Sequence, residues 1–187
     1  MMDPKTLALL VTVILAFIGY FATYINNLIV NRRKDYFDLV NNRINNFYGP
    51  LYVYTQVSNT AFKALIKKLN KEEENPQLKG QLSEKEQKEW RLWLVNVFMP
   101  LNDWIEKIIF ENAYLIIEKD MPQCLLDYVT HLSGYKTVVA KLNLDDFSED
   151  ESIIDFPSDL IEYAEKSYSM LKEEQLRLMG KLGYEIK

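Results

Sequence analysis

The chain opens with an uninterrupted apolar run. No charged residue occurs between Thr6 and Asn31, and the stretch from Leu7 to Ile25 is dominated by Leu, Ile, Val, Phe and Ala. A helix over this stretch is roughly 28 Å long at 1.5 Å of rise per residue, which matches the hydrocarbon core of a bilayer. We therefore predict a single transmembrane helix over residues 6–30, after a short segment of residues 1–5.

Two alternatives to a retained anchor are weaker. A cleaved signal peptide has a shorter apolar core followed by a small-x-small cleavage site, and no such site follows this run. A buried core helix of a soluble protein rarely continues this far without a charge.

Beyond the run, apolar residues recur every three or four positions, which predicts amphipathic helices. The apolar positions of the first of these helices, called the seam, are spaced alternately by 3 and 4 residues, as in a heptad repeat. Its leading members are Phe37, Val40, Ile44, Phe47, Leu51 and Tyr54. Gly49 and Pro50 interrupt the seam. Because proline lacks a backbone donor and crowds the preceding turn, we predict a hinge there.

Three further helical stretches follow. Ser83 and Glu86 have the spacing of a capping box, and Pro100 predicts a second hinge or a helix restart. The segment from Asn46 to Leu51 resembles that from Asn96 to Leu101, through either duplication or chance. Another helix follows Pro122 and pauses at Ser133–Gly134, and the last opens at Phe156–Pro157.

These patterns predict an all-α fold, with an N-terminal transmembrane helix and then a helical bundle over residues 31–187. The bundle has about four main helices, two with proline kinks. Their predicted bounds are about 34–70, 84–117, 122–140 and 157–182, with an acidic loop over 143–156.

Flanking cations predict the orientation. Arg32, Arg33 and Lys34 follow the apolar run, whereas only Lys5 and the amino group precede it, offset by Asp3. Since Lys and Arg near a span are retained on the cytoplasmic side, we expect the N-terminus outside and residues 31–187 in the cytoplasm. We expect the cell membrane, the inner membrane of a bacterium, with the cationic triplet as a topology signal that can also touch lipid headgroups.

Composition removes several function classes. The net charge of −5 and the pI near 5.1 argue against a nucleic-acid partner. One cysteine excludes a disulfide framework within the chain, and one histidine disfavours a His-rich metal site. No phosphate loop, HExxH, Cys-x-x-Cys or nucleophile elbow occurs, so we expect no enzyme activity, metal or cofactor.

The single histidine lies on a helix face with Cys124 and Asp127. Cys124 and His131 are two turns apart, about 10 Å along the axis, which is too far for a thiolate–imidazole pair. Asp127 and His131 have i, i+4 spacing, so we predict a partly exposed face with a local ion pair.

The tryptophans and the acidic loop are candidate contact surfaces. Trp90 and Trp104 follow the helical spacing and are predicted to be core, whereas Trp93 lies off that stripe. The acidic loop contains no glycine, unlike a calcium-binding loop, which favours a solvated loop or a basic partner. The predicted partner surface is Trp93, Asp145, Asp146, Glu149, Asp150 and Glu151.

Small and weakly polar residues form one stripe of the apolar helix, with spacings of 4, 3, 4 and 3. The stripe is Thr12, Ala16, Gly19, Thr23 and Asn26. Such residues let membrane helices approach closely, which predicts self-association. The alternative is that small residues are simply common there and that the cytoplasmic seam packs inside its own bundle.

Three functional hypotheses follow. The first is a membrane-anchored interaction or scaffold protein, whose partners are the bilayer, a second copy of the chain and another protein. The second is an oligomeric membrane effector whose cytoplasmic domain senses a signal or small ligand and perturbs the bilayer, as in stress or phage defence. The third, an enzyme on a tether, lacks any supporting motif.

Overall fold

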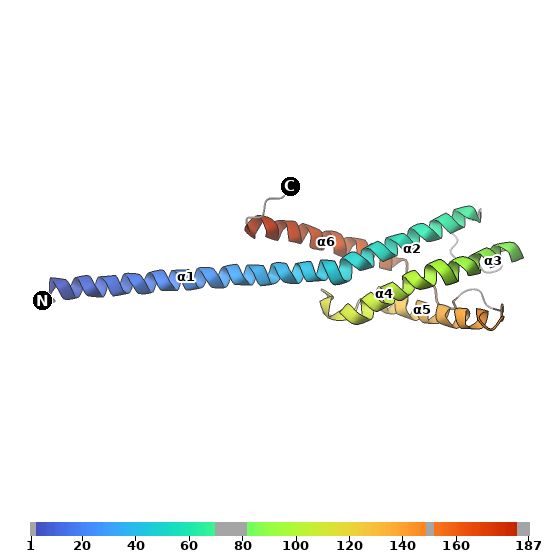
Figure 1. Cartoon of the computed structure of the whole chain (residues 1–187), viewed down its shortest axis with the longest axis horizontal. Coiled ribbons are helices and arrows are strands. Elements are labelled where there is room, and N and C mark those ends of the chain that lie inside the picture. Colours follow the sequence, from blue (N-terminus) through green and yellow to red (C-terminus); the bar gives the residue numbers. More distant parts are fainter. Residues whose placement is uncertain (1–2, 70–81, 149–151, 183–187) are drawn as a thin grey trace. The chain divides into compact units, whose positions relative to one another are not determined.

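A computed structural model describes residues 3–69, 82–148 and 152–182 (Figure 1). All regular secondary structure in these ranges is helical, which confirms the all-α prediction and the single long apolar N-terminal helix. The elements are α1 (Pro4–Arg43), η1 (Ile44–Tyr48), α2 (Gly49–Lys68), α3 (Glu84–Trp93), η2 (Leu94–Phe98), α4 (Met99–Asn112), η3 (Ala113–Leu115), α5 (Gln123–Leu142) and α6 (Asp159–Leu182).

These elements join into four helical stretches. The second stretch opens with the predicted capping box. The Ser83 hydroxyl accepts the Glu86 N–H, and the Glu86 carboxylate accepts the Ser83 N–H at 2.7 Å. The predicted pause at Ser133–Gly134 is wrong, because α5 continues through both residues to Leu142.

The chain forms two compact units. The first comprises the described residues within 1–41 and 174–187. The second comprises those within 42–173, and it holds most of the core. Within the second unit, one apolar cluster joins α2, the α3–η2 stretch and α5. Its buried members are Leu65, Ile66, Leu69, Trp90, Leu94, Phe98 and Val138.

Four members of the predicted seam, namely Val40, Ile44, Phe47 and Leu51, are buried, and Phe37 and Tyr54 are half-buried. The seam therefore packs within its own chain. Trp90 is buried as predicted, but the prediction that Trp104 is core is wrong. Half of the Trp104 side chain is exposed (50%), and its indole stacks on the Tyr54 ring with centroids 6.2 Å apart.

A π-helical turn precedes each of the two prolines, Pro50 and Pro100, that interrupt a longer helical stretch. The Gly49 N–H bonds to the Ile44 carbonyl, and the Met99 N–H bonds to the Leu94 carbonyl, so both turns span five residues. Pro50 and Pro100 follow at the same register. A wider turn relieves the crowding that a proline ring imposes on the turn before it. The two similar sequence segments thus adopt one local structure, and the bends at Gly49, Pro50 and Pro100 stay a prediction.

Gly49 meets a steric demand of the first π-turn. A Cβ at this position would lie 2.4 Å from the Ile44 carbonyl oxygen, closer than real contacts allow. Glycine therefore lets the backbone pack tightly at the junction of η1 and α2.

Candidate functional site

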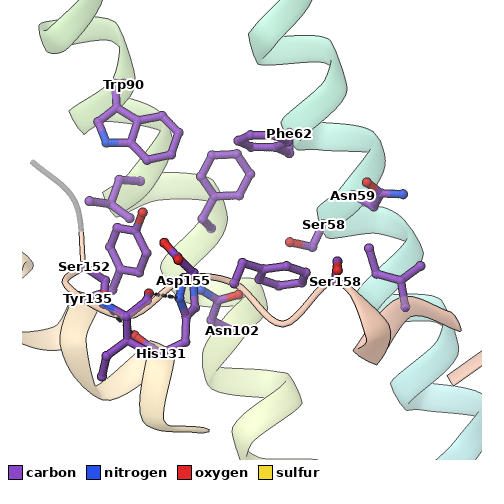
Figure 2. Close-up of a pocket in the computed structure, with 15 residues that line it drawn as sticks. Ser58, Asn59, Phe62, Trp90, Asn102, His131, Tyr135, Ser152, Asp155 and Ser158 are labelled. Carbon is purple, nitrogen blue, oxygen red and sulfur yellow. Dashed lines mark hydrogen bonds between the residues drawn. The ribbon is translucent and has the colours of Figure 1, made fainter. Parts of the chain in front are cut away.

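The second unit contains a cavity of about 420 Å³ between its helices (Figure 2). This volume is within the range of small-molecule sites. The lining residues are Ser58, Asn59 and Phe62 of α2, Trp90, Leu94 and Phe98 of the α3–η2 stretch, Asn102 of α4, His131 and Tyr135 of α5, Ser152, Ile154, Asp155, Phe156 and Ser158 of the following segment, and Ile161 of α6. Figure 2 shows Trp90 and Phe62 on one side and His131 and Asn102 on the other.

One cavity wall depends on a close approach between α5 and the segment of residues 152–158. Gly134 makes that approach possible, because a Cβ there would lie 2.1 Å from the Ser152 hydroxyl oxygen. The Ser152 hydroxyl donates to the His131 carbonyl at 3.3 Å and accepts the Ile154 N–H at 3.1 Å. The segment is thereby held against the helix.

His131 is a buried, neutral group in this wall. Its side chain is 7% exposed, and Nδ1 lies 2.6 Å from the Ile154 carbonyl oxygen. Burial lowers the pKa of His131, while hydrogen bonds to the Ile154 and Asp155 backbones oppose that shift. Because a carbonyl can only accept, Nδ1 carries the proton of the neutral ring, and Nε2 retains a lone pair.

The sequence-based prediction for this histidine is wrong. His131 is buried rather than on a partly exposed face, and its partner is the Ile154 carbonyl rather than Asp127. Asp127 instead accepts from the Gln123 side-chain amide at 2.7 Å. Cys124 is also buried, and burial raises its pKa to about 11, so its thiol is not activated.

We expect the stability of the full chain to fall on mild acidification. The folded pKa of His131 is lower than the unfolded value near 6.5, so the unfolded chain binds more protons below pH ~6.5. The neutral ring's contribution to the free energy of unfolding is fully present above this pH, and it is lost as the pH falls through the folded pKa. His131 is the only histidine, so H131N should flatten the profile of free energy of unfolding between about pH 5 and 7. An unchanged slope in H131N would contradict this assignment.

The opposite wall is aromatic. The Phe98 ring lies near those of Phe62 and Trp90, with centroids 6.4 and 5.8 Å away. In the wall that contains His131, the imidazole ring meets the Phe156 and Tyr135 rings edge-on. A flat ligand inserted here would therefore meet ring faces and edges on both sides.

The polar groups around the cavity are mostly neutral. Asn102 accepts the Tyr128 hydroxyl at 2.8 Å, and burial raises the pKa of that phenol, which keeps it protonated. Ser58, Asn59 and Ser158 add uncharged groups, and Asp155 is the only carboxylate among the described lining residues, which include no Lys or Arg. Such a lining suits a neutral or cationic molecule and disfavours an anion.

A second polar cluster adjoins the first π-turn. The Tyr48 hydroxyl accepts the Ile117 N–H at 2.9 Å, and the hydroxyls of Tyr48 and Tyr163 both donate to a Glu118 oxygen, at 3.3 and 3.2 Å. Burial raises the pKa of both phenols. The cluster ties η1 to α6 and to the segment after η3. Sequence reasoning missed it, because its members are far apart in the chain and share no periodicity.

The predicted contact stripe of the apolar helix lies on α1, and all of its members are exposed. They are Thr12, Ala16, Gly19, Thr23 and Asn26. The Thr12 and Thr23 hydroxyls donate to carbonyls four residues earlier, and a Cβ on Gly19 would meet no atom within 4 Å. Arg32, Arg33 and Lys34 are also exposed on α1.

The predicted partner surface is only partly described. Trp93 is half-buried, donates its indole N–H to Glu89 at 2.9 Å and packs near Phe98. Asp145 and Asp146 are exposed, and hydrogen bonds from Ser148 lower the pKa of Asp146. The remaining members, Glu149, Asp150 and Glu151, lie outside the described residues.

Comparison with family models, curated proteins and solved structures gives no match. Across residues 3–69, 82–148 and 152–182, no group of three or more His, Cys, Asp or Glu side chains could hold a metal ion. The cavity is therefore the feature on which we base a functional proposal.

Proposed function

We propose that this chain is a single-pass membrane protein whose cytoplasmic helical domain binds a neutral small molecule and relays that binding to its membrane helix. This develops the sensing hypothesis drawn from the sequence. The observation that carries the proposal is the cavity, in which neutral polar groups and aromatic rings from five helical elements and one extended segment converge.

The exposure of α1 supports membrane anchorage. Every side chain from Asp3 to Tyr36 is exposed, including the whole apolar run, and a helix within Pro4–Lys68 is long and apolar enough to cross a bilayer. An apolar helix that packs on nothing in its own chain is unfavourable in water. Lipid supplies the apolar surroundings that the described chain does not.

The π-turns support a relay. Leu94 and Phe98 of η2 line the cavity, and Ser58 lies on α2, which is continuous through η1 with α1. π-turns are local irregularities inside α-helices that often occur at functional sites. A ligand with different affinities for two packings of these helices would shift the population of α1 arrangements.

Binding is testable with the full chain in lipid nanodiscs. Indole and benzimidazole serve as neutral planar probes, with their carboxylate derivatives as anionic counterparts, and binding is read by ligand-observed NMR. We expect the neutral probes to bind more strongly, because Lys and Arg are absent from the described lining. S58L, which projects extra carbons from a lining position, should weaken binding, whereas T60L at an exposed position of α2 should not.

Equal binding by S58L and T60L would place the probes elsewhere and contradict the cavity assignment. Equally strong binding of the carboxylates would contradict the predicted preference for uncharged ligands.

A second candidate function is the interaction or scaffold role, in which copies of the chain associate through α1. The exposed stripe on α1 favours it, because its small residues are open to a neighbouring helix. On the domain, Trp104 stacks on Tyr54 and is half exposed, and Val53 and Val57 are exposed one turn apart on α2. These apolar groups are the candidate contacts for a protein partner.

Self-association should appear as disulfide crosslinking between membrane helices. We expect A16C and G19C, each in a C124S background, to form several-fold more dimer in native membranes than I14C, which lies on the opposite face of the helix. The readout is the dimer fraction on non-reducing gels after mild oxidation. Crosslinking that is equal at all three positions, or absent, would contradict association through this stripe.

A further inference from the structure

The last turns of α6 lie beside the end of the exposed part of α1, within the first compact unit. The Gln175 side-chain amide N–H donates to the side-chain amide oxygen of Asn41 at 2.6 Å. Two turns or less from these residues, hydrogen bonds from Arg177 and from Tyr36 lower the pKa of Glu174. Leu178 is buried, which indicates that this packing is close.

The direction and register of α6 follow from one contact and the course of the helix. Gln175 of α6 pairs with Asn41 of α1, and the last turns of α6 run back toward the N-terminus of α1 (Figure 1). The two helices are therefore antiparallel. Seven residues separate Gln175 from Leu182 and also Asn41 from Lys34, about 10 Å along each axis. Leu182 thus lies near the level of Lys34.

That level coincides with the headgroup layer of a bilayer spanned by α1. The predicted transmembrane helix of residues 6–30 ends four residues before Lys34, which is about 6 Å further along the helix. A headgroup layer is roughly 5–8 Å thick on each side of the hydrocarbon core. The last turn of α6 is therefore placed among the headgroups, on the side that the flanking cations mark as cytoplasmic.

The chemistry at this level suits anionic lipid. Arg32, Arg33 and Lys34 on α1 and Lys181 on α6 are all exposed, and Asp35 is the nearest exposed acid on α1. Leu176 is exposed on α6, and Met179 and Leu182 are half-buried, so apolar side chains accompany the cations. Cations that flank apolar side chains bind anionic membrane surfaces through charge and partial insertion together.

We propose that the C-terminal turn of α6 and the Arg32–Lys34 triplet form one binding surface for anionic phospholipid headgroups. The inference rests on the proposed membrane anchorage and adds to it a second membrane contact, made by the other end of the chain. Lipid is the partner favoured, because the surface is continuous with the apolar span. It would hold α6 against the membrane and restrict the end of α1 that leads to the first π-turn.

The test places a fluorophore on G180C in a C124S background, with the full chain in nanodiscs. A Cβ at position 180 meets no atom within 4 Å, so the label is accommodated. Quenching by headgroup-nitroxide lipids is compared between phosphatidylcholine discs and discs that also contain phosphatidylglycerol. We expect stronger quenching in the anionic discs, and we expect high salt to reduce it.

Neutralising single lysines tests which residue holds α6 at the anionic membrane surface. K181Q should lower the ratio of docked to undocked α6 about fivefold in anionic discs, the effect of one juxtamembrane cation. K166Q, at an exposed lysine of α6 that pairs with Glu162, is the matched control and should leave quenching unchanged.

The inference is overturned if quenching is equal in neutral and anionic discs, or if K181Q and K166Q behave alike. Alkaline carbonate extraction separates this failure from that of the proposed anchorage. A chain that stays in carbonate-washed membranes while its label is unquenched refutes the lipid surface alone. A chain released by carbonate refutes the anchorage, and the lipid surface with it.

Discussion

Replacing Phe98 with alanine is expected to lower the free energy of unfolding of the helical domain by about 3–5 kcal/mol. Phe98 is 6% exposed, and its ring centroid lies 5.8–6.4 Å from those of Trp90, Trp93 and Phe62. Truncation removes buried apolar area and enlarges a cavity that the ring already lines. Neighbouring helices can collapse into the space only in part. The decrease in the free energy of unfolding should therefore lie near the upper end of this range.

The measurement is denaturant unfolding of the full chain in detergent, followed by tryptophan fluorescence so that the domain rather than α1 is observed. L92A is the matched control, since Leu92 is on the same helical stretch but is 60% exposed, and its effect should stay within about 0.5 kcal/mol. A loss of less than about 1 kcal/mol in F98A would mean that the ring is not part of a packed core.

The second large effect is expected at Gly134, where alanine should destabilise the domain by about 1–3 kcal/mol. On an open helix the same change stabilises by up to about 1 kcal/mol, because glycine is a poor helix former. The sign is reversed here because the new methyl group would lie 2.1 Å from the Ser152 hydroxyl oxygen and 3.1 Å from its Cβ. Either the Ser152 side chain must give up its hydrogen bonds to His131 and Ile154, or the segment of residues 152–158 must move away from α5, and both changes loosen one wall of the cavity.

A double-mutant cycle with S152G isolates this contact. S152G removes the atoms that a Cβ at position 134 would meet, so G134A should cost less in the S152G background than in the native chain. G180A is the matched control, because nothing lies within 4 Å of a Cβ there, and it should be neutral or stabilising. Additive effects of G134A and S152G would contradict the close approach, as would stabilisation by G134A alone.

The two variants also separate stability from binding. F98A and G134A alter opposite walls of the cavity. Both should therefore weaken binding of the neutral planar probes at temperatures where the domain remains folded. L92A and G180A should leave probe binding intact, because neither residue lines the cavity.

Local features of this protein were predictable from its sequence, because their causes are local. The uninterrupted apolar run predicted α1, the spacing of Ser83 and Glu86 predicted the cap of α3, and Pro50 and Pro100 marked the positions of the π-turns. Each depends on residues within a turn or two of one another, where propensity and backbone chemistry decide the outcome.

The side of each helix that faces the core was predicted less well. Trp104 follows the same helical spacing as Trp90, yet half of it is exposed. The η2 turn lies between them, and an inserted residue rotates the following face by about 100° relative to an ideal helix. Periodicity assumes a constant twist, so a stripe cannot be extrapolated through a π-turn.

What the sequence by itself determined is the class of elements, their approximate bounds and the one segment apolar enough to cross a membrane. Only the tertiary structure brought His131 to the Ile154 carbonyl, Tyr48 to Glu118, and Ser152 to Gly134. These contacts join residues that are 18 to 70 positions apart. They form because helices pack at particular angles around side chains of particular volumes, and no spacing along a single helix specifies that packing.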